Sequence, residues 1–432
     1  MVNTYLIHSV RLGLEDDTTT SVLIDQGLVL ELDPVAASYP QASVLNGQST
    51  ALLPGLVDHH VHIGAWLRSQ RSTEIRGVCI AEELVAALPD NRGWRVLFGL
   101  DHHHDVRQAL AALDEVQSPC VIVHRTGHAV LMNAHAAKSL GRGSVTKIDH
   151  GRGLWGEALG PVEEGWEAQH LHALSAHLLQ QGVVAIQDAT PYPARASERC
   201  RFLQRALAPI RVSFMSDPVS ELGFATFTKV LDPTGMPPVS SYPSAVHAIE
   251  PVEILQAIAL LKRNQGRFDR SSRIEHAAIC PPLVAEQIRE AGVTVCSNPA
   301  FLMERSTALE HLRISGVDEF LCPVAMLKDL GVPVIFGSDA PVTKPGVWAS
   351  VRAAVARGAH EVPFAGEALS MADAMSAVTV REVPLSRDGW RGMPGDLVLL
   401  DLGQSLFDSG CSPVKAVFIG GVLVFGNDFT RG

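Results

Sequence analysis

A histidine cluster near the N-terminal end of the sequence has the residue types and the spacing of a metal site. The segment Pro54-Gly55-Leu56-Val57-Asp58-His59-His60-Val61-His62 is an apolar, β-prone run that ends in histidines, and its first two residues favour a tight turn into the strand. Side chains alternate between the two faces of a strand, so His60 and His62 point the same way. Two imidazoles on one face can bind one metal ion. A bare His-x-His pair also arises by chance, so the prediction depends on the residues that accompany it.

Four more residues with metal-binding chemistry end or follow β-prone runs later in the chain. They are Lys229 in Phe227–Leu231, His247 in Ala245–Ile249, His276 in Arg273–Ala277, and Asp339 after Val334–Ser338. A lone lysine usually lies on the surface, and a lone histidine is more often a hydrogen-bonded core residue than a ligand. Their shared position at strand ends is what favours a site, because closure of one barrel would bring all of them to the same mouth as the first two histidines.

The runs that carry these residues belong to a repeating pattern of strands and helices. After the first strand the β-prone runs are Val183–Gln187, Arg211–Met215, Phe227–Leu231, Ala245–Ile249, Arg273–Ala277, Val293–Ser297 and Pro333–Gly337. Apolar residues at helical spacing lie between them, for example in Pro251–Arg263 and Pro282–Ala291. This alternation predicts an α/β fold with a parallel sheet, and the eight units predict a (β/α)8 TIM barrel.

Both ends of the chain have a different sequence pattern, with short β-prone runs separated by turn residues. Residues 1–53 contain the runs Thr4–Ile7, Ser21–Ile24 and Leu28–Leu32, while the C-terminal end has a strand at Asp396–Asp401 and a hairpin around Gly420-Gly421. We expect residues 1–53 plus 390–432 to form one small, β-sandwich-like domain around a barrel domain of residues 54–389. Residues of about 64–165 do not fit the repeat, and we interpret them as an insertion after the first barrel strand that covers the mouth, with a separate domain as the alternative.

Composition favours a small molecule as the partner. The formal net charge is −11, which argues against a nucleic-acid or anionic-membrane surface, and hydrophobic residues make up 47% of the chain. No basic, apolar leader and no run of membrane-spanning length is visible, and the seven cysteines are scattered without a Cys-x-x-Cys pair. We therefore predict a cytoplasmic protein with reduced thiols, and the sequence leaves open whether it is a homodimer.

Taken together, several of these segments resemble a known family. The sequence is similar to the amidohydrolase superfamily, specifically its amidohydrolase-3 or YtcJ-like branch, in the Pro54–His62 run and in Gly127-His128, Gly182–Ala189, Val246–Ile249, Arg273–Ala277 and Gly337–Val342. The resemblance implies a metal-dependent hydrolase of non-peptide C–N bonds. It also implies a lysine carboxylated on its side-chain nitrogen at Lys229, which would bridge two divalent ions.

The expected metal ligands are therefore His60, His62, Lys229, His247, His276 and Asp339. Two zinc ions are the expected cofactors, although manganese, iron or cobalt suit the same ligands. We expect a metal-activated water to attack the substrate, with Asp339 as general acid and base.

Three further residues, His128, Glu157 and Trp66, are candidates for contact with the substrate, and His128 fits the core of the insertion equally well. The run from Asp101 to Asp105 includes three histidines, but we interpret it as a polar loop, because no other ligand run accompanies it. Two other functions stay open at this point. One is a deaminase with a single metal ion, which would not need Lys229, and the other is a barrel without catalytic activity that acts as a binding module.

Overall fold

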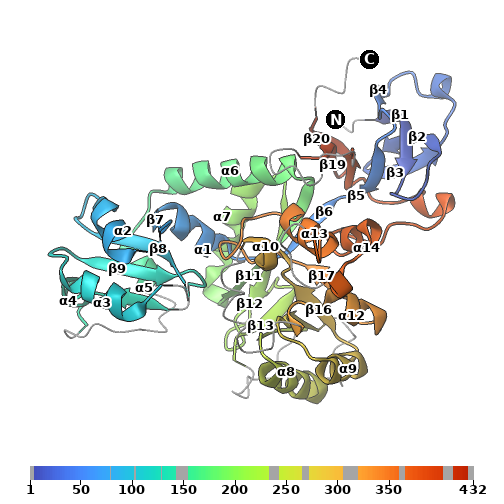
Figure 1. Cartoon of the computed structure of the whole chain (residues 1–432). Coiled ribbons are helices and arrows are strands. Elements are labelled where there is room, and N and C mark those ends of the chain that lie inside the picture. The colour runs from blue at the N-terminus through green and yellow to red at the C-terminus, as the bar shows by residue number, and fades with distance from the viewer. Residues whose placement is uncertain are drawn as a thin grey trace.

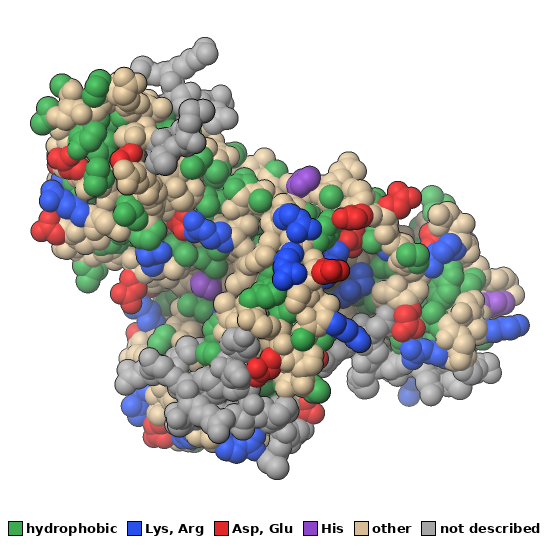
Figure 2. Space-filling view, turned by 180° about the vertical axis from the view of Figure 1, so that it is seen from behind, with side chains coloured by type: hydrophobic (Ala, Val, Ile, Leu, Met, Phe, Trp, Pro, Cys, Tyr) green, Lys and Arg blue, Asp and Glu red, His purple; other side chains and the backbone are tan. Residues whose placement is uncertain are grey.

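In the computed structural model of the chain, a barrel carries a sheet on one side and an insertion on another (Figure 1). The structure describes residues 4–77, 79–101, 104–127, 129–142, 154–232, 243–264, 272–304, 320–359, 365–401 and 412–426. Seen from behind, basic and acidic side chains are interspersed over the surface (Figure 2). Among the described residues, no helix combines the length and the apolar character that crossing a membrane requires.

The barrel consists of eight parallel strands in the order of the chain. They are β6 (Leu56–Val61), β11 (Val183–Tyr192), β12 (Arg211–Ser216), β13 (Phe227–Val230), β14 (Ser244–Ala248), β15 (Arg273–His276), β16 (Thr294–Ser297) and β17 (Val334–Phe336). The last strand returns to the first through residues beyond its end, where Val61 bridges Ala340 and the Asp339 amide donates to the His60 carbonyl at 2.7 Å. The predicted barrel is confirmed, and each predicted run coincides with one strand.

Helices cover the outside of the barrel. They are α6 (Glu164–Gln180), α7 (Ser197–Leu207), α8 (Pro251–Asn264), α9 (Pro282–Ala291), α10 (Ala300–Glu304), α12 (Val324–Asp329), α13 (Trp348–Val355) and α14 (Met371–Ser376). Helix α9 shows how the sequence sets their limits, because Pro282 opens it and Gly292 ends it in the left-handed conformation with a φ of 64°. Its buried face, which includes Val284 and Ile288, packs into the apolar layer around the barrel.

A second sheet joins the two ends of the chain. It contains β1 (Tyr5–Leu12), β2 (Thr19–Asp25), β3 (Leu28–Leu32), β4 (Ser43–Asn46), β5 (Ala51–Pro54), β18 (Leu397–Leu400), β19 (Val414–Ile419) and β20 (Val422–Phe425). The ring of Tyr5 packs edge-on against Phe418 across this sheet, so the two ends share one core with the buried Trp390. The fold class is therefore as predicted, while the domain limits at residues 53 and 390 stay a prediction.

The segment between the two sheets is nearly continuous. We expected a tight turn at Pro54-Gly55, but Pro54 ends β5 and Leu56 begins β6, so Gly55 is the only residue between the strands. A side chain at Gly55 would lie 2.5 Å from a methyl group of Val184, which explains why glycine stands there. The first barrel strand is thus anchored directly to the composite sheet.

The insertion has its own sheet and its own core. Its elements are α1 (Ile63–Gln70), β7 (Thr73–Glu74), α2 (Ile80–Ala86), β8 (Arg95–Leu100), α3 (Val106–Asp114), β9 (Cys120–His124), β10 (Val130–Met132), α4 (Ala134–Ser139) and α5 (Leu154–Leu159). Strands β7, β8 and β9 are parallel and β10 is antiparallel to β9. The insertion extends sideways from the barrel (Figure 1). Of the described residues of the insertion, those that line the cavities at the mouth are in the Arg125-Thr126 turn and the segment from Trp66 to Arg76, together with Phe98.

Candidate metal centre

Three side chains at the junction of the first and last barrel strands have the spacing of ligands around one ion. Nε2 of His60 and Nε2 of His62 are 3.3 Å apart, and each lies 3.4 Å from Oδ1 of Asp339. Two nitrogen ligands about 2.0–2.1 Å from a tetrahedral metal ion lie about 3.3–3.4 Å apart. The three atoms therefore fit one metal ion without any rearrangement of the histidines.

The backbone around Asp339 is built to hold it there. The buried carboxylate of Asp58 accepts hydrogen bonds from the Ser338 amide at 2.8 Å and the Ser338 hydroxyl at 2.6 Å, which ties β6 to the segment after β17. Asp339 itself has a φ of 56°, an uncommon conformation for a residue other than glycine. A Cβ on Gly337 would lie 2.4 Å from the Cβ of His60, so this position requires glycine.

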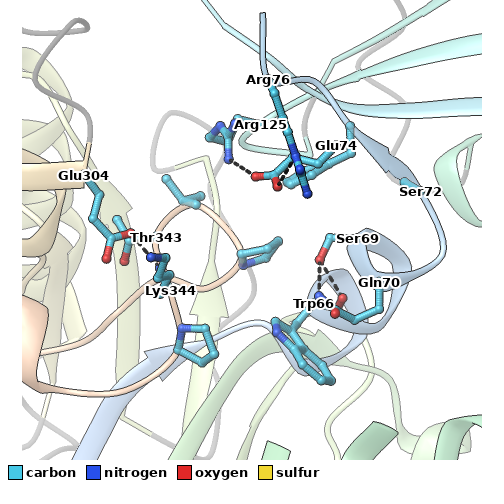
Figure 3. A pocket seen from close by; sticks show the side chains of 14 residues that line it. Trp66, Ser69, Gln70, Ser72, Glu74, Arg76, Arg125, Glu304, Thr343 and Lys344 are labelled. Carbon is cyan, nitrogen blue, oxygen red and sulfur yellow. Dashed lines mark hydrogen bonds and ion pairs between the residues drawn. The ribbon is translucent and has the colours of Figure 1, made fainter. Parts of the chain in front are cut away.

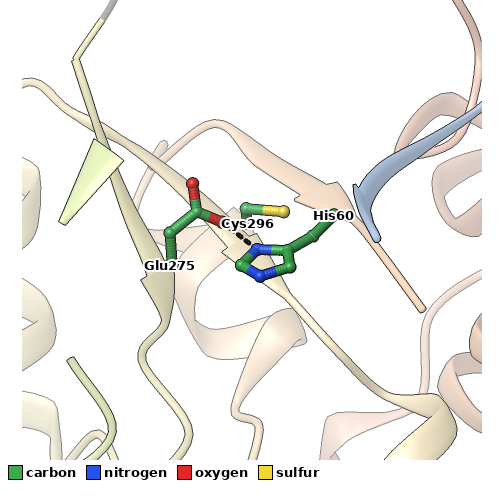
Figure 4. A group of neighbouring side chains, drawn as sticks. All are labelled: His60, Glu275 and Cys296. Atoms are coloured by element: carbon green, nitrogen blue, oxygen red, sulfur yellow. Dashed lines mark hydrogen bonds and ion pairs between the residues drawn. The ribbon is translucent and has the colours of Figure 1, made fainter. Parts of the chain in front are cut away.

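The imidazole of His60 is oriented from behind by a buried carboxylate. Oε2 of Glu275 contacts Nδ1 of His60 (Figure 4). The other oxygen, Oε1, accepts a hydrogen bond from Nε of Arg273 at 2.6 Å. Burial raises the pKa of Glu275, but Arg273, Lys229 and His60 outweigh it and hold that pKa well below its usual value. Burial and the nearby lysine lower the pKa of His60 to about 3, so the ring is neutral and Nε2 is available to a metal.

The thiol of Cys296 lies beside Glu275 and His60, close enough for the three to be considered a metal site of their own (Figure 4). The contacts argue otherwise. Both oxygens of Glu275 and Nδ1 of His60 already have partners. Burial also raises the pKa of Cys296 well above its ordinary value, which keeps it a thiol. We interpret this group as the support of His60, in the way that carboxylates support metal-bound histidines.

A second group of ligand candidates comes from the neighbouring strands. Lys229, His247 and His276 line one cavity of about 290 Å³ together with His62 and Asp339. Nδ1 of His276 contacts Oδ1 of Asn298 at 2.7 Å, which leaves Nε2 of that ring as the possible ligand atom. The rings of His247 and His276 meet edge to face with centroids 4.6 Å apart. The structure thus brings the second group of candidates to the same mouth as the first.

His276 reaches the cavity through its backbone conformation. Arg273 and Glu275 point into the barrel, so simple alternation would turn His276 outward. Instead its φ is 76°, and Ala277 follows with a φ of 44°. Burial lowers the pKa of His276, which keeps the imidazole in the neutral, ligand-competent form.

Lys229 provides the test of whether the residues fit a metal pair. Its side chain is 1% exposed, and Nζ has no hydrogen-bond partner among the residues that the structure describes. Burial lowers the pKa of this amine. A buried amine without a partner costs free energy, whereas a carboxylate formed on it by carbon dioxide would offer two oxygens to cations. The surroundings of Lys229 therefore fit a bridging ligand better than a simple lysine.

The remaining predicted contacts have different positions. Trp66 lines a second cavity beside the metal centre. Glu157 lies on α5, is about half exposed and is 3.4 Å from Arg142, and it is not among the described residues that line either cavity at the mouth. His128, His102 and His103 lie outside the described residues. The ring of His104 bonds the Asp101 amide and the Gly77 carbonyl, as the interpretation of a polar loop predicts.

Sequence reasoning missed the partners that orient the candidate ligands. It assigned no role to Arg273 or Asn298, and it did not foresee that Glu275 would contact His60 as well as pair with Arg273. Asn298 had one usable signal, because it follows the strand ending at Ser297 and so had to lie at the same mouth. The pairing of Glu275 with His60 spans 215 positions in the sequence and had none.

Comparison with known proteins is consistent with this geometry. A family model described as the amidohydrolase family matches residues 240–425, which include His247, His276 and Asp339. The matched segment therefore resembles the amidohydrolase family. No curated protein matches this sequence.

Solved structures resemble the fold of this chain over nearly its whole length. An uncharacterized metal-dependent hydrolase from Pyrococcus furiosus is 17% identical, with a TM-score of 0.64 over 92% of this chain and 99% of that one. N-isopropylammelide isopropylaminohydrolase from Burkholderia multivorans is 16% identical, with a TM-score of 0.54 over 98% of each chain. Ochratoxinase from A. niger is 13% identical, with a TM-score of 0.55 over 98% of this chain and 96% of that one. At these identities the likeness shows the shared fold.

Proposed function

We propose that this protein is a metal-dependent hydrolase that cleaves an amide-like, non-peptide C–N bond of a small molecule. The observation that carries the proposal is the group of Nε2 of His60, Nε2 of His62 and Oδ1 of Asp339, whose mutual distances of 3.3 to 3.4 Å match the ligands of one ion. The match of residues 240–425 to the amidohydrolase family model supports it, and one structural neighbour is an isopropylaminohydrolase by name.

The proposed ligands divide into two sets. His60, His62 and Asp339 would hold one divalent ion, His247 and His276 would hold a second, and a carboxylated Lys229 would bridge them. Zinc suits this mixture of imidazole and carboxylate, and manganese, iron or cobalt are alternatives. Bound divalent ions of this kind lower the pKa of water and polarise a carbonyl group.

Asp339 is the proposed proton carrier. Burial raises its pKa, but the hydrogen bond with His62 and the nearby imidazoles outweigh burial and hold the pKa well below its ordinary value. The group is therefore a carboxylate at neutral pH and can accept a proton from the attacking water. As the water oxygen bonds to the carbonyl carbon and the C–N bond breaks, the same carboxyl returns the proton to the leaving nitrogen.

One observation favours a second candidate, a deaminase with a single metal ion. The first set of ligands has metal spacing by itself, while among the described residues no group of His, Cys, Asp or Glu with that spacing includes His247 or His276. Metal analysis of the purified protein separates the candidates. Two ions per chain support the proposed hydrolase, and one ion per chain supports the deaminase. A protein without bound metal supports a barrel that acts only as a binding module.

The activity test is a panel of formamides, N-acyl amines, cyclic amides and ureas, assayed with zinc, manganese, iron or cobalt added. A matched control is His172→Ala, because His172 is exposed on α6. We expect His172→Ala to turn over normally and His60→Ala to be inactive with less bound metal. If the wild-type protein binds two ions per chain and hydrolyses no C–N bond in the panel, the proposed reaction is wrong.

A further inference from the structure

A second cavity adjoins the metal centre on the side of the insertion. It has a volume of about 660 Å³ and lies between the segment from Trp66 to Arg76, the start of the turn after β9, and residues 341–345 (Figure 3). Val342 and Thr343 belong to the walls of both cavities. Other walls are also shared by neighbours in sequence, since Arg125 lines the second cavity and Thr126 the first. The two cavities therefore lie next to each other, within the span of one extended substrate.

The two cavities differ in chemistry. The wall of the metal cavity away from the ligands is mainly apolar, although Glu250 and Thr126 also belong to it. Its apolar side chains include Leu231, Ile249, Ile279, Phe301 and Leu321. In the second cavity, charged and hydroxyl side chains from the insertion and the barrel stand around the opening (Figure 3). The pair of cavities thus suits a molecule with an apolar group at one end and a polar group at the other.

Arg125 is the polar group in the second cavity that is best prepared to bind a ligand. Its guanidinium lies over the ring of Phe98, with CZ 5.6 Å from the ring centroid, and a Cβ on Gly99 would come within 2.8 Å of Nη2. The side chain is only 18% exposed, and Nε is buried with no hydrogen-bond partner among the described residues. Its ion pairs with Glu74 and Asp101 are long, at 3.6 and 4.0 Å.

A guanidinium held in this way can bind a carboxylate. Close charge-assisted hydrogen bonds from arginine are about 2.7–2.9 Å long, so neither acidic neighbour of Arg125 makes one. Phe98 and the space above Gly99 fix the plane of the group before any ligand arrives. A carboxylate that enters the cavity could accept two hydrogen bonds from it at little cost in side-chain entropy.

The charges of the cavity favour the same sign of ligand. Three cationic side chains line it, Arg76, Arg125 and Lys344, against the two carboxyl groups of Glu74 and Glu304. Glu304 already accepts a hydrogen bond from the Lys344 amide at 2.8 Å, so one of its acceptor sites is occupied within the wall. The balance therefore leaves the cavity positive and attractive to an anion.

We propose that the second cavity binds a carboxylate of the substrate through Arg125, so that the substrate class is amides with an apolar group on one side of the scissile bond and a carboxylate on the other. This inference rests on the proposed function for the scissile bond, but the binding of the carboxylate does not depend on turnover. Trp66, on the same wall, would then contact the segment that connects the two ends.

Three probes of nearly equal size test the proposal: N-phenylacetylglycine, its neutral analogue N-phenylacetylglycinamide, and the cationic N-phenylacetyl-ethylenediamine. Binding is measured by calorimetry on the metal-loaded Asp339→Asn protein, and turnover is measured on the wild-type background. The variants are Arg125→Gln, which removes the charge, and Arg125→Lys, which keeps it. Arg107→Gln is the matched control, because Arg107 is exposed on α3.

We expect the carboxylate probe to bind most tightly and Arg125→Gln to weaken that binding by roughly 10- to 100-fold, the usual effect of losing a hydrogen bond to a charged group. The neutral probe should change little, Arg125→Lys should restore part of the difference, and Arg107→Gln should behave as the parent. A loss of the same size for the neutral probe, or no preference for the carboxylate, would overturn the inference. A preference for the cationic probe would assign the cavity to Glu74 and Glu304 instead.

The same experiment separates the two proposals. If the carboxylate probe binds through Arg125 but no probe is hydrolysed by the wild-type protein, the cavity assignment holds and the proposed reaction fails. If amides are hydrolysed without regard to the carboxylate, the reaction holds and the cavity assignment fails.

Discussion

Replacing Lys229 by methionine tests the most unusual feature of the centre. The lysine side chain is buried at 1% exposure with its amine unpartnered among the described residues. Methionine has a similar length and no polar end, so the change removes the amine without opening a large cavity. Glu275 is the carboxylate whose charge interacts most strongly with Lys229. After the substitution it keeps Arg273 and His60 as hydrogen-bond partners.

The substitution should have opposite effects with and without metal. In metal-free protein the unsatisfied amine costs about 1–3 kcal/mol, so Lys229→Met should raise the stability by that amount and increase the melting temperature. In the presence of zinc the wild-type protein gains stability in proportion to its metal affinity. The variant should gain less, because it has lost the bridging ligand and with it the second ion.

The assay combines melting curves with and without zinc, metal analysis, and a native mass spectrum for the increment of one carbon dioxide. Lys138→Met is the matched control, since Lys138 is exposed on α4 and should change none of these values. A short carboxylic acid in the buffer should return part of the activity to Lys229→Ala. Full binding of two ions by Lys229→Met, or a lower stability of its metal-free form, would refute the reasoning.

Four other substitutions test the remaining parts of the centre. Asp339→Asn should keep most of the bound metal and lower kcat by roughly 10²–10⁴, the usual worth of an acid–base group; near-normal turnover would remove it from the mechanism. His62→Ala should lose metal and activity together, and full metal content by elemental analysis would contradict its role as a ligand. Glu275→Gln should weaken metal binding by roughly 10- to 100-fold, measured by competition with a chelator; an unchanged affinity would leave it a purely structural residue. Gly337→Ala should destabilise the protein by about 1–3 kcal/mol, because its Cβ would overlap His60, and an unchanged melting temperature would show that the segment can move aside.

The barrel could be predicted from the sequence because its strands carry two kinds of signal at once. Runs such as Val183–Gln187 are apolar on both faces, as parallel strands under helices must be, and polar residues mark their ends. The C-terminal hairpin was predictable because its two β-prone runs are separated by a turn signal, Gly420-Gly421, which lies between β19 and β20. Strands β7 and β10 of the insertion have only two and three residues, too few for any periodicity.

Candidate ligands could be named from the sequence, but their geometry could not. His60 and His62 follow from the alternation of one strand, but the same rule places His276 on the wrong face. The side chain of His276 reaches the cavity because its φ is 76°, a conformation that the local sequence does not predict. The position of Arg125 beside the barrel mouth depends on how the insertion packs, and no pattern within the insertion encodes it.

Barrel closure and assembly of the metal site are the same event in this fold. The last strand β17 contacts β6 through residues past its end, with the Asp339 amide on the His60 carbonyl, the His62 amide on the Ala340 carbonyl at 2.9 Å, and Ser338 on Asp58. Each buried hydrogen bond of this kind contributes about 1 kcal/mol. These bonds fix the three atoms that have metal spacing, so a metal bound there would in turn stabilise the closed ring. The ligands of the first strand and of the last are thus positioned by the contacts that make the barrel continuous.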